Sequence, residues 1–112
     1  MSELDKLLKE KVNDINKDTE KMDYVRRWIG NGYSGKVIVF ATPKKSHHMV
    51  FTRDKVILRA GEYPSCEVRY IGNEEDIMAV FSGETSAYTG VRTGRLVVWG
   101  NLNEATIFER IP

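Results

Sequence analysis

The sequence has few of the features that mark secreted or membrane proteins. Cys66 is its only cysteine, so no disulfide can form within the chain. The first eleven residues carry charges throughout and lack the apolar core of a signal peptide. No apolar run approaches the roughly 18 residues that a membrane-spanning helix needs. We therefore expect a cytoplasmic protein that does not insert stably into a membrane.

An excess of either charge is also missing. Lys and Arg number 17 and Asp and Glu number 16, which gives a formal net charge of +1. Such a balance provides no general attraction to nucleic acid or to an anionic membrane surface. We predict no nucleic-acid partner, and we interpret the basic pairs at 26–27 and 44–45 as solvated surface charge.

Residue sets that carry catalysis or bind metals are scarce. The two histidines, His47 and His48, are adjacent, and neighbours on a strand point to opposite faces, so the pair is poorly placed to hold one ion. We interpret them as surface histidines. Cys66 has no evident base beside it and fits a buried structural thiol. The glycines at 30–35 precede a strand, the reverse of a phosphate-binding loop. We predict no metal, no cofactor and no catalytic residue.

Length and composition favour one ordinary globular domain over residues 1–112. The chain has 112 residues, of which 41% are hydrophobic and 29% charged, enough for one core. Apolar residues recur at helical spacing over 3–17 and predict an amphipathic helix. A break and a second helix starting at Asp18 or Thr19 follow. The predicted buried side of the second helix consists of Met22, Val25, Trp28 and Ile29.

Four segments rich in β-branched and aromatic residues predict strands at 36–42, 48–52, 55–60 and 66–71. The first is apolar on both of its faces, which indicates a central strand covered on both sides. Two residues separate the second from the third, so these strands predict a tight hairpin. The fourth alternates Cys66, Val68 and Tyr70 with polar residues and predicts a half-exposed strand.

The stretch 73–111 has the clearest boundaries. Asn73 is a candidate N-cap, the acidic residues after it suit the first turn of a helix, and Gly83 suits its end. A glycine-containing loop, a glycine-bounded strand over 95–99 and a final helix follow. The order of helices, four strands, helix, strand and helix predicts an α+β fold. We expect a five-stranded, mostly antiparallel sheet covered by helices.

This stretch resembles the lipid-transfer domain of the sterol carrier protein type 2 (SCP-2) family. The matching pieces are Asp-Ile-Met-Ala-Val-Phe-Ser-Gly at 76–83, Gly-Arg-Leu-Val-Val-Trp-Gly-Asn at 94–101 and the amphipathic end at 102–111. The resemblance extends back to Tyr24 as strand order. It implies an SCP-2-like fold with a hydrophobic tunnel beside the sheet. It also implies non-catalytic binding of an apolar small molecule such as a fatty acid, an acyl thioester or another lipid.

Carried over position by position, the resemblance implies that apolar side chains from the last four segments line the tunnel and bind the ligand. They are Met78, Phe81, Tyr88, Val91, Leu96, Val98, Leu102, Ile107 and Phe108. Burying an apolar ligand gains roughly 25 cal/mol per Å² and needs no reactive group. Two alternatives stay open. The same side chains could fill the core of a protein-interaction module, or the chain could be an enzyme, although it has no visible nucleophile–base pair.

Val97 and Trp99 occupy positions that are usually polar in the family strand. Alternation places Leu96 and Val98 on the core side of this strand and therefore Val97 and Trp99 on the other side. An exposed apolar pair often marks an interface. We therefore expect a homodimer through Val97 and Trp99, unless the N-terminal helix or the loop after Pro43 covers them.

Overall fold

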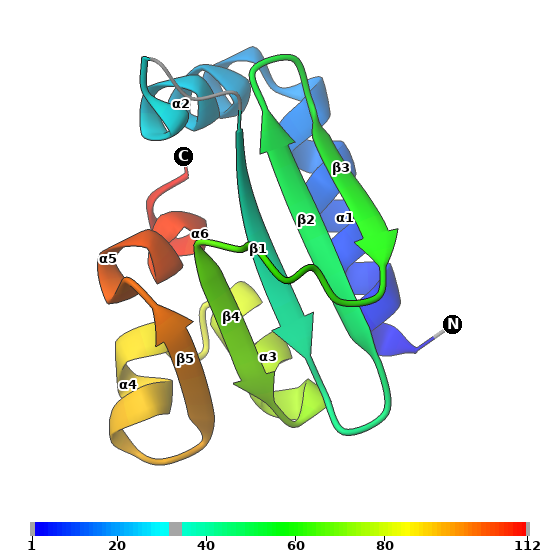
Figure 1. Cartoon of the computed structure of the whole chain (residues 1–112), viewed down its shortest axis with the longest axis vertical. Helices are drawn as coiled ribbons and strands as arrows, with labels where there is room; N and C mark the ends of the chain where they lie inside the picture. The colour runs from blue at the N-terminus through cyan, green and yellow to red at the C-terminus, as the bar shows by residue number, and fades with distance from the viewer. Residues whose placement is uncertain (1, 32–34, 112) are drawn as a thin grey trace.

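The computed structural model describes residues 2–31 and 35–111, without the side chain of Leu102. Within this part the predicted α+β architecture is present (Figure 1). In chain order the elements are α1 (Glu3–Lys17), α2 (Thr19–Ile29), β1 (Gly35–Ala41), β2 (Ser46–Thr52), β3 (Val56–Ala60), β4 (Val68–Gly72), α3 (Glu74–Phe81), α4 (Ala87–Arg92), β5 (Leu96–Gly100), α5 (Leu102–Ala105) and α6 (Ile107–Arg110).

The five strands form one sheet in the order β3-β2-β1-β4-β5. The pairs β1–β2, β2–β3 and β4–β5 are antiparallel, and β1–β4 is parallel. The predicted five-stranded, mostly antiparallel sheet and the central position of β1 are confirmed. The predicted hairpin is also confirmed, since the Thr52 N–H donates to the Lys55 carbonyl at 3.0 Å across its two-residue turn.

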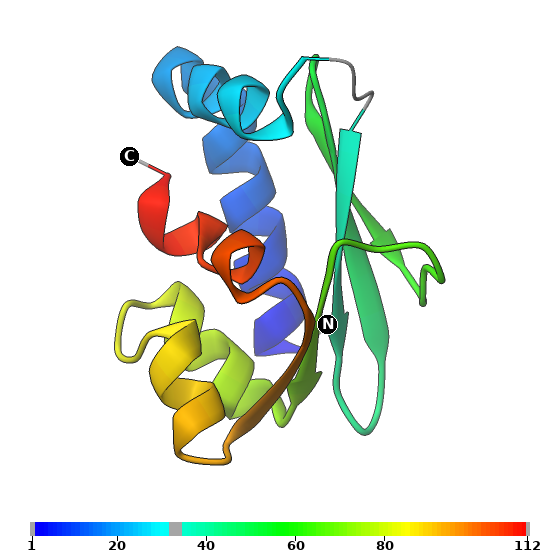
Figure 2. The ribbon, with the colours of Figure 1, turned by 60° about the vertical axis from the view of Figure 1, so that its left-hand side comes forward.

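All described helices lie on one face of the sheet (Figure 2). The predicted break between the first two helices falls at Asp18, which ends α1 and then caps α2. Its carboxylate accepts the N–H groups of Glu20 and Lys21 at 2.9 and 3.2 Å. Ser2 and Asp5 form a capping box at the start of α1. Local capping chemistry therefore sets the bend that lets both helices reach the sheet.

Strand alternation divides each strand between the helix-covered face and the opposite face. The side chains on the helix-covered face join apolar residues of the helices in one core. From the strands these are Ile38, Phe40, Met49, Phe51, Val56, Val68, Tyr70 and Leu96. From the helices they include Leu4, Leu8, Val12, Ile15, Met22, Val25, Ile29, Ile77, Val80, Phe81 and Ile107. Trp28, predicted as buried with α2, is half-buried and packs against this core.

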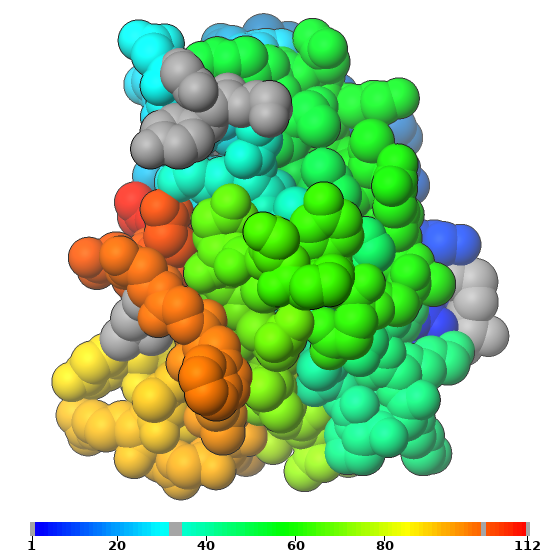
Figure 3. Space-filling view, viewed as in Figure 1, coloured from blue at the N-terminus to red at the C-terminus, as the bar shows by residue number. Residues whose placement is uncertain are grey.

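The opposite face of the sheet is covered at its centre by the segment 61–67, which we call the strap (Figure 3). The Glu67 N–H donates to the Val37 carbonyl at 3.0 Å, and the Glu67 carboxylate accepts the Val37 N–H at 2.8 Å. His48 hydrogen-bonds the Gly61 carbonyl at 2.9 Å through Nδ1. Val39 lies on this face and is fully buried. The predicted cover on both sides of β1 is therefore present, as helices on one side and the strap on the other.

Both glycines that bound β5 have a left-handed backbone, with φ of 77° at Gly94 and 101° at Gly100. They differ in their surroundings. A Cβ at Gly94 would meet open space, whereas a Cβ at Gly100 would overlap the backbone carbonyl of Glu67 at the end of the strap. Gly100 therefore allows the close approach between β5 and the strap, in addition to ending the strand.

Several predictions of detail are wrong. The loop expected after Gly83 contains the helix α4, because Ser86 caps it by accepting the Thr89 N–H. The final helix consists of two short ones, α5 and α6. Asn73 stands at the N-cap of α3 but makes no side-chain cap hydrogen bond.

Cys66 and the histidines also differ from their predicted surroundings. Cys66 lies on the strap before β4 begins and is half-buried, so it is not the buried thiol expected from the alternation. His48 is buried beneath the strap, and His47 is largely buried against Asp5, so neither is a surface histidine.

Candidate functional site

A cluster of aromatic rings occupies the interior between the sheet and α3 and α6. Phe40 of β1 and Tyr70 of β4 stack with their ring centroids 5.4 Å apart and their planes 5° from parallel. Phe81, the last residue of α3, lies 5.4 Å from Phe40. Phe108 of α6 closes the cluster, with its centroid 4.6 Å from Phe81, 5.9 Å from Phe40 and 6.0 Å from Phe51. We call these five residues the aromatic cluster.

Tyr70 carries the only polar atom of the aromatic cluster. Its hydroxyl donates to the Ala105 carbonyl, so the phenol ties the last residue of α5 to the sheet. Burial, with a smaller contribution from the negative charge of Glu109, raises the pKa of Tyr70 well above its usual value. The phenol therefore stays neutral and cannot serve as a base, and the interior remains apolar except for one satisfied hydrogen bond.

The C-terminal helices are held in place around the aromatic cluster by polar contacts at its rim. The Glu109 carboxylate accepts the Ala87 N–H at 2.7 Å, so α6 caps the start of α4. Lys36 pairs with Glu104 of α5 at 2.7 Å, and the Lys36 ammonium lies 4.7 Å from the ring centroid of Trp28. Trp28 in turn contacts Phe51 edge-on, with their ring centroids 5.2 Å apart.

Six of the nine predicted wall residues belong to this interior. Phe81, Leu96 and Ile107 are buried, and Met78, Val98 and Phe108 are half-buried against the same core. Tyr88 and Val91 do not join it, because they lie on α4 with 55% and 39% of their surface exposed. Their predicted place as walls is corrected by this helix, which turns them outward. Leu102 lies outside the described side chains.

Sequence reasoning missed the contribution of the first strands. Phe40, Phe51 and Tyr70 supply three of the five rings of the aromatic cluster, although the resemblance pointed only to residues after 73. Their alternation with residues of the opposite face was visible in the sequence. It could have placed these large side chains on the helix-covered face together with the C-terminal segments.

Two openings at the surface lead to the aromatic cluster along the same side of α1. One has a volume of about 380 Å³, lies beside Leu7, Glu10 and Asp14, and reaches Phe81. The other, of about 50 Å³, lies beside Ile15 and Lys21 and reaches Phe108 and Ile111. Lys11 and Asp14 line both openings, Phe81 lines one and Phe108 lines the other, and we call the two neighbouring openings together the cleft.

The two histidines lie outside the cleft and apart from each other. His47 and His48 point to opposite faces of β2, as predicted: His47 Nε2 lies 2.6 Å from Asp5 Oδ1, and the His48 ring lies 5.3 Å from the ring of Tyr63 on the strap. No group of three or more His, Cys, Asp or Glu residues that could hold an ion occurs within residues 2–31 and 35–111.

The sequence profile of the SCP-2 sterol transfer family matches residues 5–111, nearly the whole chain. The chain belongs to the SCP-2 sterol transfer family. This membership agrees with the apolar interior, and it indicates that the chain is a lipid-binding or lipid-transfer protein. SCP-2 domains are generally carriers without catalytic activity. No curated protein sequence matches the chain.

Solved structures of SCP-2 domains share this fold at low sequence identity. The apo form of Sterol Carrier Protein 2 from Yarrowia lipolytica matches with a TM-score of 0.64 and 16% identity, over 95% of this chain and 87% of that one. The ubiquinone synthesis protein UbiJ-SCP2 matches with a TM-score of 0.69 and 15% identity, over 90% and 81%.

A similar unit also occurs inside a much larger enzyme. The sec-alkylsulfatase Pisa1 from Pseudomonas sp. matches with a TM-score of 0.67 and 10% identity, over 80% of this chain. The matched unit is 14% of the Pisa1 chain. At these identities each structure shows a shared fold and nothing about a shared ligand. No helix in the described part of the chain has the length and apolar character needed to cross a membrane.

Proposed function

We propose that the chain binds one apolar ligand, a fatty acid, an acyl thioester or another lipid, in the interior that the aromatic cluster now occupies. The predicted residues Met78, Phe81, Leu96, Val98, Ile107 and Phe108 would contact it, joined by Phe40, Phe51 and Tyr70. Family membership supports the ligand class. The two openings beside α1 support a route from the surface to the rings.

Phe108 is the ring that would move to admit the ligand. It contacts each of the other four rings, with 6.4 Å between its centroid and that of Tyr70. It sits on the four-residue helix α6, is half-buried and lines the cleft, whereas Phe40 and Tyr70 are buried on central strands. Outward rotation of Phe108 would join the cleft to the interior, and the energy of ligand burial would replace its lost contacts.

Titration with a fluorescent fatty acid tests this proposal, together with native mass spectrometry of the purified protein. We expect micromolar binding or a co-purifying lipid. Phe108→Ala should bind the probe at least about threefold more tightly, because the smaller side chain leaves space for the ligand. Tyr88→Ala, a truncation of an exposed aromatic residue, should leave affinity unchanged. A folded Phe108→Ala protein that binds no probe, alongside a lipid-free wild type, would refute the proposal.

A second function is favoured by Val97 and Trp99, which are 54% and 64% exposed on the face opposite the helices. Neither α1 nor the loop after Pro43 covers them. They support the alternative of a homodimer through this pair. Trp99→Lys should lower the sedimentation coefficient to that of a monomer, and the control Tyr88→Lys should not. Wild-type protein that sediments as a monomer at high concentration would end this alternative.

We infer a single domain over 1–112, supported by the one core that joins all layers. We also infer a cytoplasmic location, supported by the lone Cys66, which suits a reducing compartment.

A further inference from the structure

The strand β3 forms one edge of the sheet, and its backbone groups alternate between the ladder and the outside. Hydrogen bonds from Thr52 N–H to the Lys55 carbonyl and from Gly61 N–H to the Ser46 carbonyl fix the phase of the β2–β3 ladder. In that phase the backbone N–H and carbonyl groups of Ile57 and Arg59 form hydrogen bonds with β2. The N–H and carbonyl groups of Val56, Leu58 and Ala60 therefore point away from the sheet.

These outward groups are capped by a side chain at one end of β3 and face no neighbouring strand at the other. The Asn16 side chain of α1 caps Val56 as a neighbouring strand would. Its amide donates to the Val56 carbonyl at 2.9 Å and accepts the Val56 N–H at 2.8 Å. In the described part of the chain β3 is the outermost strand of the sheet, so no neighbouring strand pairs with Leu58 or Ala60. The edge is therefore protected at Val56 and open over the next two outward positions.

A groove of about 440 Å³ opens at this unprotected end of the edge. It is lined by Leu58, Arg59 and Ala60 of β3, by Lys45, Ser46 and His47 at the start of β2, and by Asp5 and Lys9 of α1. Its volume lies within the range of ligand-binding pockets. The groove thus combines backbone donors and acceptors that face no neighbouring strand, an apolar floor at Leu58 and Ala60, and a rim of basic side chains.

The one carboxylate that lines the groove, Asp5, already has partners within it. Asp5 lies 2.6 Å from His47 Nε2 and 3.3 Å from Lys45 Nζ. Burial alone would raise the pKa of Asp5. The Ser2 N–H, the Lys45 hydrogen bond and the positive charges of His47 and Lys45 outweigh it and hold this pKa below its usual value. Against this one carboxylate the lining of the groove carries three cationic side chains, those of Lys9, Lys45 and Arg59, so the groove as a whole is positively charged.

We propose that this groove docks an extended, acidic segment of a partner protein, which adds to β3 as an antiparallel sixth strand. Antiparallel pairing lets two peptide residues use both backbone groups of Leu58 and of Ala60. Directly paired residues share a face of the sheet, so the peptide residue opposite Ala60 lies on the same face as His47, with only the small Ala60 side chain between them. That residue is acidic, and the residue two positions later, opposite Leu58, is apolar. This function is additional to ligand binding in the aromatic cluster.

The test uses the acetylated, amidated pentapeptide Thr-Glu-Thr-Val-Thr and the isotope-labelled full chain. We expect saturable shifts of groove resonances by NMR and slower hydrogen exchange at the Leu58 and Ala60 amides, which only strand addition protects. Replacing Glu by Lys in the peptide should weaken binding at least about tenfold, since it opposes the charge of the rim.

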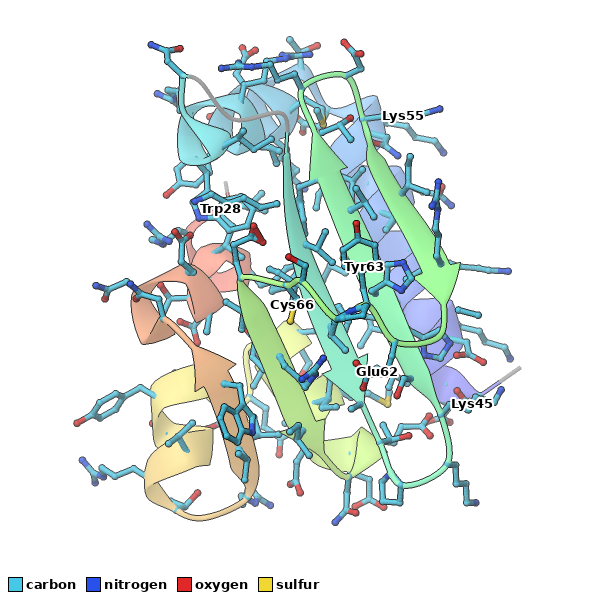
Figure 4. All side chains as sticks on the ribbon, viewed as in Figure 1. Trp28, Lys45, Lys55, Glu62, Tyr63 and Cys66 are labelled. Carbon is cyan, nitrogen blue, oxygen red and sulfur yellow. The ribbon has the colours of Figure 1, made fainter. Side chains whose placement is uncertain are left out.

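Matched variants separate the backbone edge from the charged rim. Ala60→Pro removes an N–H that the ladder does not use and should weaken binding about fivefold, while Ala60→Val should retain it. Lys45→Glu should weaken binding, and Lys55→Glu, at the opposite end of β3, should not (Figure 4). Phe108→Ala should leave peptide affinity unchanged, which separates this result from that of the proposed ligand site.

Four results would overturn the proposal. One is no binding of the peptide at millimolar concentration. The second is equal binding of the Glu and Lys peptides, and the third is binding without protection of the Leu58 and Ala60 amides. The fourth is displacement of the peptide by laurate when neither ligand protects these amides, which would assign the groove to a small amphipathic anion.

Discussion

Large apolar side chains lie on both faces of the sheet, but they are buried on one face and exposed on the other. On the helix-covered face Phe40 and Tyr70 have less than 2% of their surface exposed. On the other face Val97 and Trp99 are 54% and 64% exposed, although they neighbour core residues along β5. The strand sequence alone therefore does not decide burial. The elements that cover each face decide it.

The cover on the opposite face also varies from one strand to the next. The strap buries Val39 at the centre and is held there by Glu67 and by the hydrogen bond from His48 to the Gly61 carbonyl. It does not reach the outer residues of β5. The exposed patch at Val97 and Trp99 is thus a local feature of one edge strand, and the face as a whole is not bare.

The largest expected contrast between the two faces is in how much stability is lost when a side chain is truncated to Ala. Phe40→Ala should lower the free energy of unfolding by about 3–5 kcal/mol, because it leaves a cavity beside the three aromatic rings that Phe40 contacts. Val97→Ala should change it by less than about 0.5 kcal/mol, since the side chain is exposed. Urea denaturation measures both. A loss above about 2 kcal/mol for Val97→Ala would show that an interface covers this face in solution.

The buried phenol gives the helix-covered face a dependence on pH. The pKa of Tyr70 is raised in the folded state, so the folded protein holds this proton more tightly than the unfolded chain does. Stability should be independent of this group below pH 10 and should fall by about 1.4 kcal/mol per pH unit as pH rises above 10. Tyr70→Phe should remove that part of the slope. An identical slope in both proteins between pH 10 and 11 would contradict the assignment.

Local sequence signals predicted much of the fold. The capping residue Asp18 predicted the break between α1 and α2, and the two-residue spacing before Lys55 predicted the hairpin. The apolar character of β1 on both faces predicted its central place and double cover. Each of these features depends on neighbouring residues in the chain, which is why a single sequence suffices for them.

Features set by distant contacts were not predictable in this way. Gly90 suggested a loop, yet it lies inside α4, where a Cβ would overlap the Leu96 side chain. This glycine serves helix–strand packing rather than a turn. The aromatic cluster likewise joins five elements, and only the folded chain shows that Phe108 meets rings from β1 and β2 while Tyr88 and Val91 face outward.

A smaller contrast separates adjacent residues of β5. Val98 packs against the core and Val97 does not. Val98→Thr should lower the free energy of unfolding by about 1–2 kcal/mol, because it places a hydroxyl at a partly buried apolar site. Val97→Thr should cost less than about 0.5 kcal/mol, since Thr suits an exposed strand position. Equal costs by chemical denaturation would mean that the two faces of β5 are equally covered.

The smallest expected effect tests what holds the strap on its face. Glu62 on the strap and Arg69 of β4 are joined at 2.7 Å, with 48% and 28% of their side chains exposed. Water and salt screen such a pair, so Glu62→Gln should cost less than about 1 kcal/mol, and less still at high salt. Glu84→Gln, an exposed charge removed elsewhere, is the matched control. The buried His48 and the Glu67 hydrogen bonds should carry most of the attachment. A loss above about 2 kcal/mol for Glu62→Gln would show instead that the surface ion pair holds the strap and keeps Val39 covered.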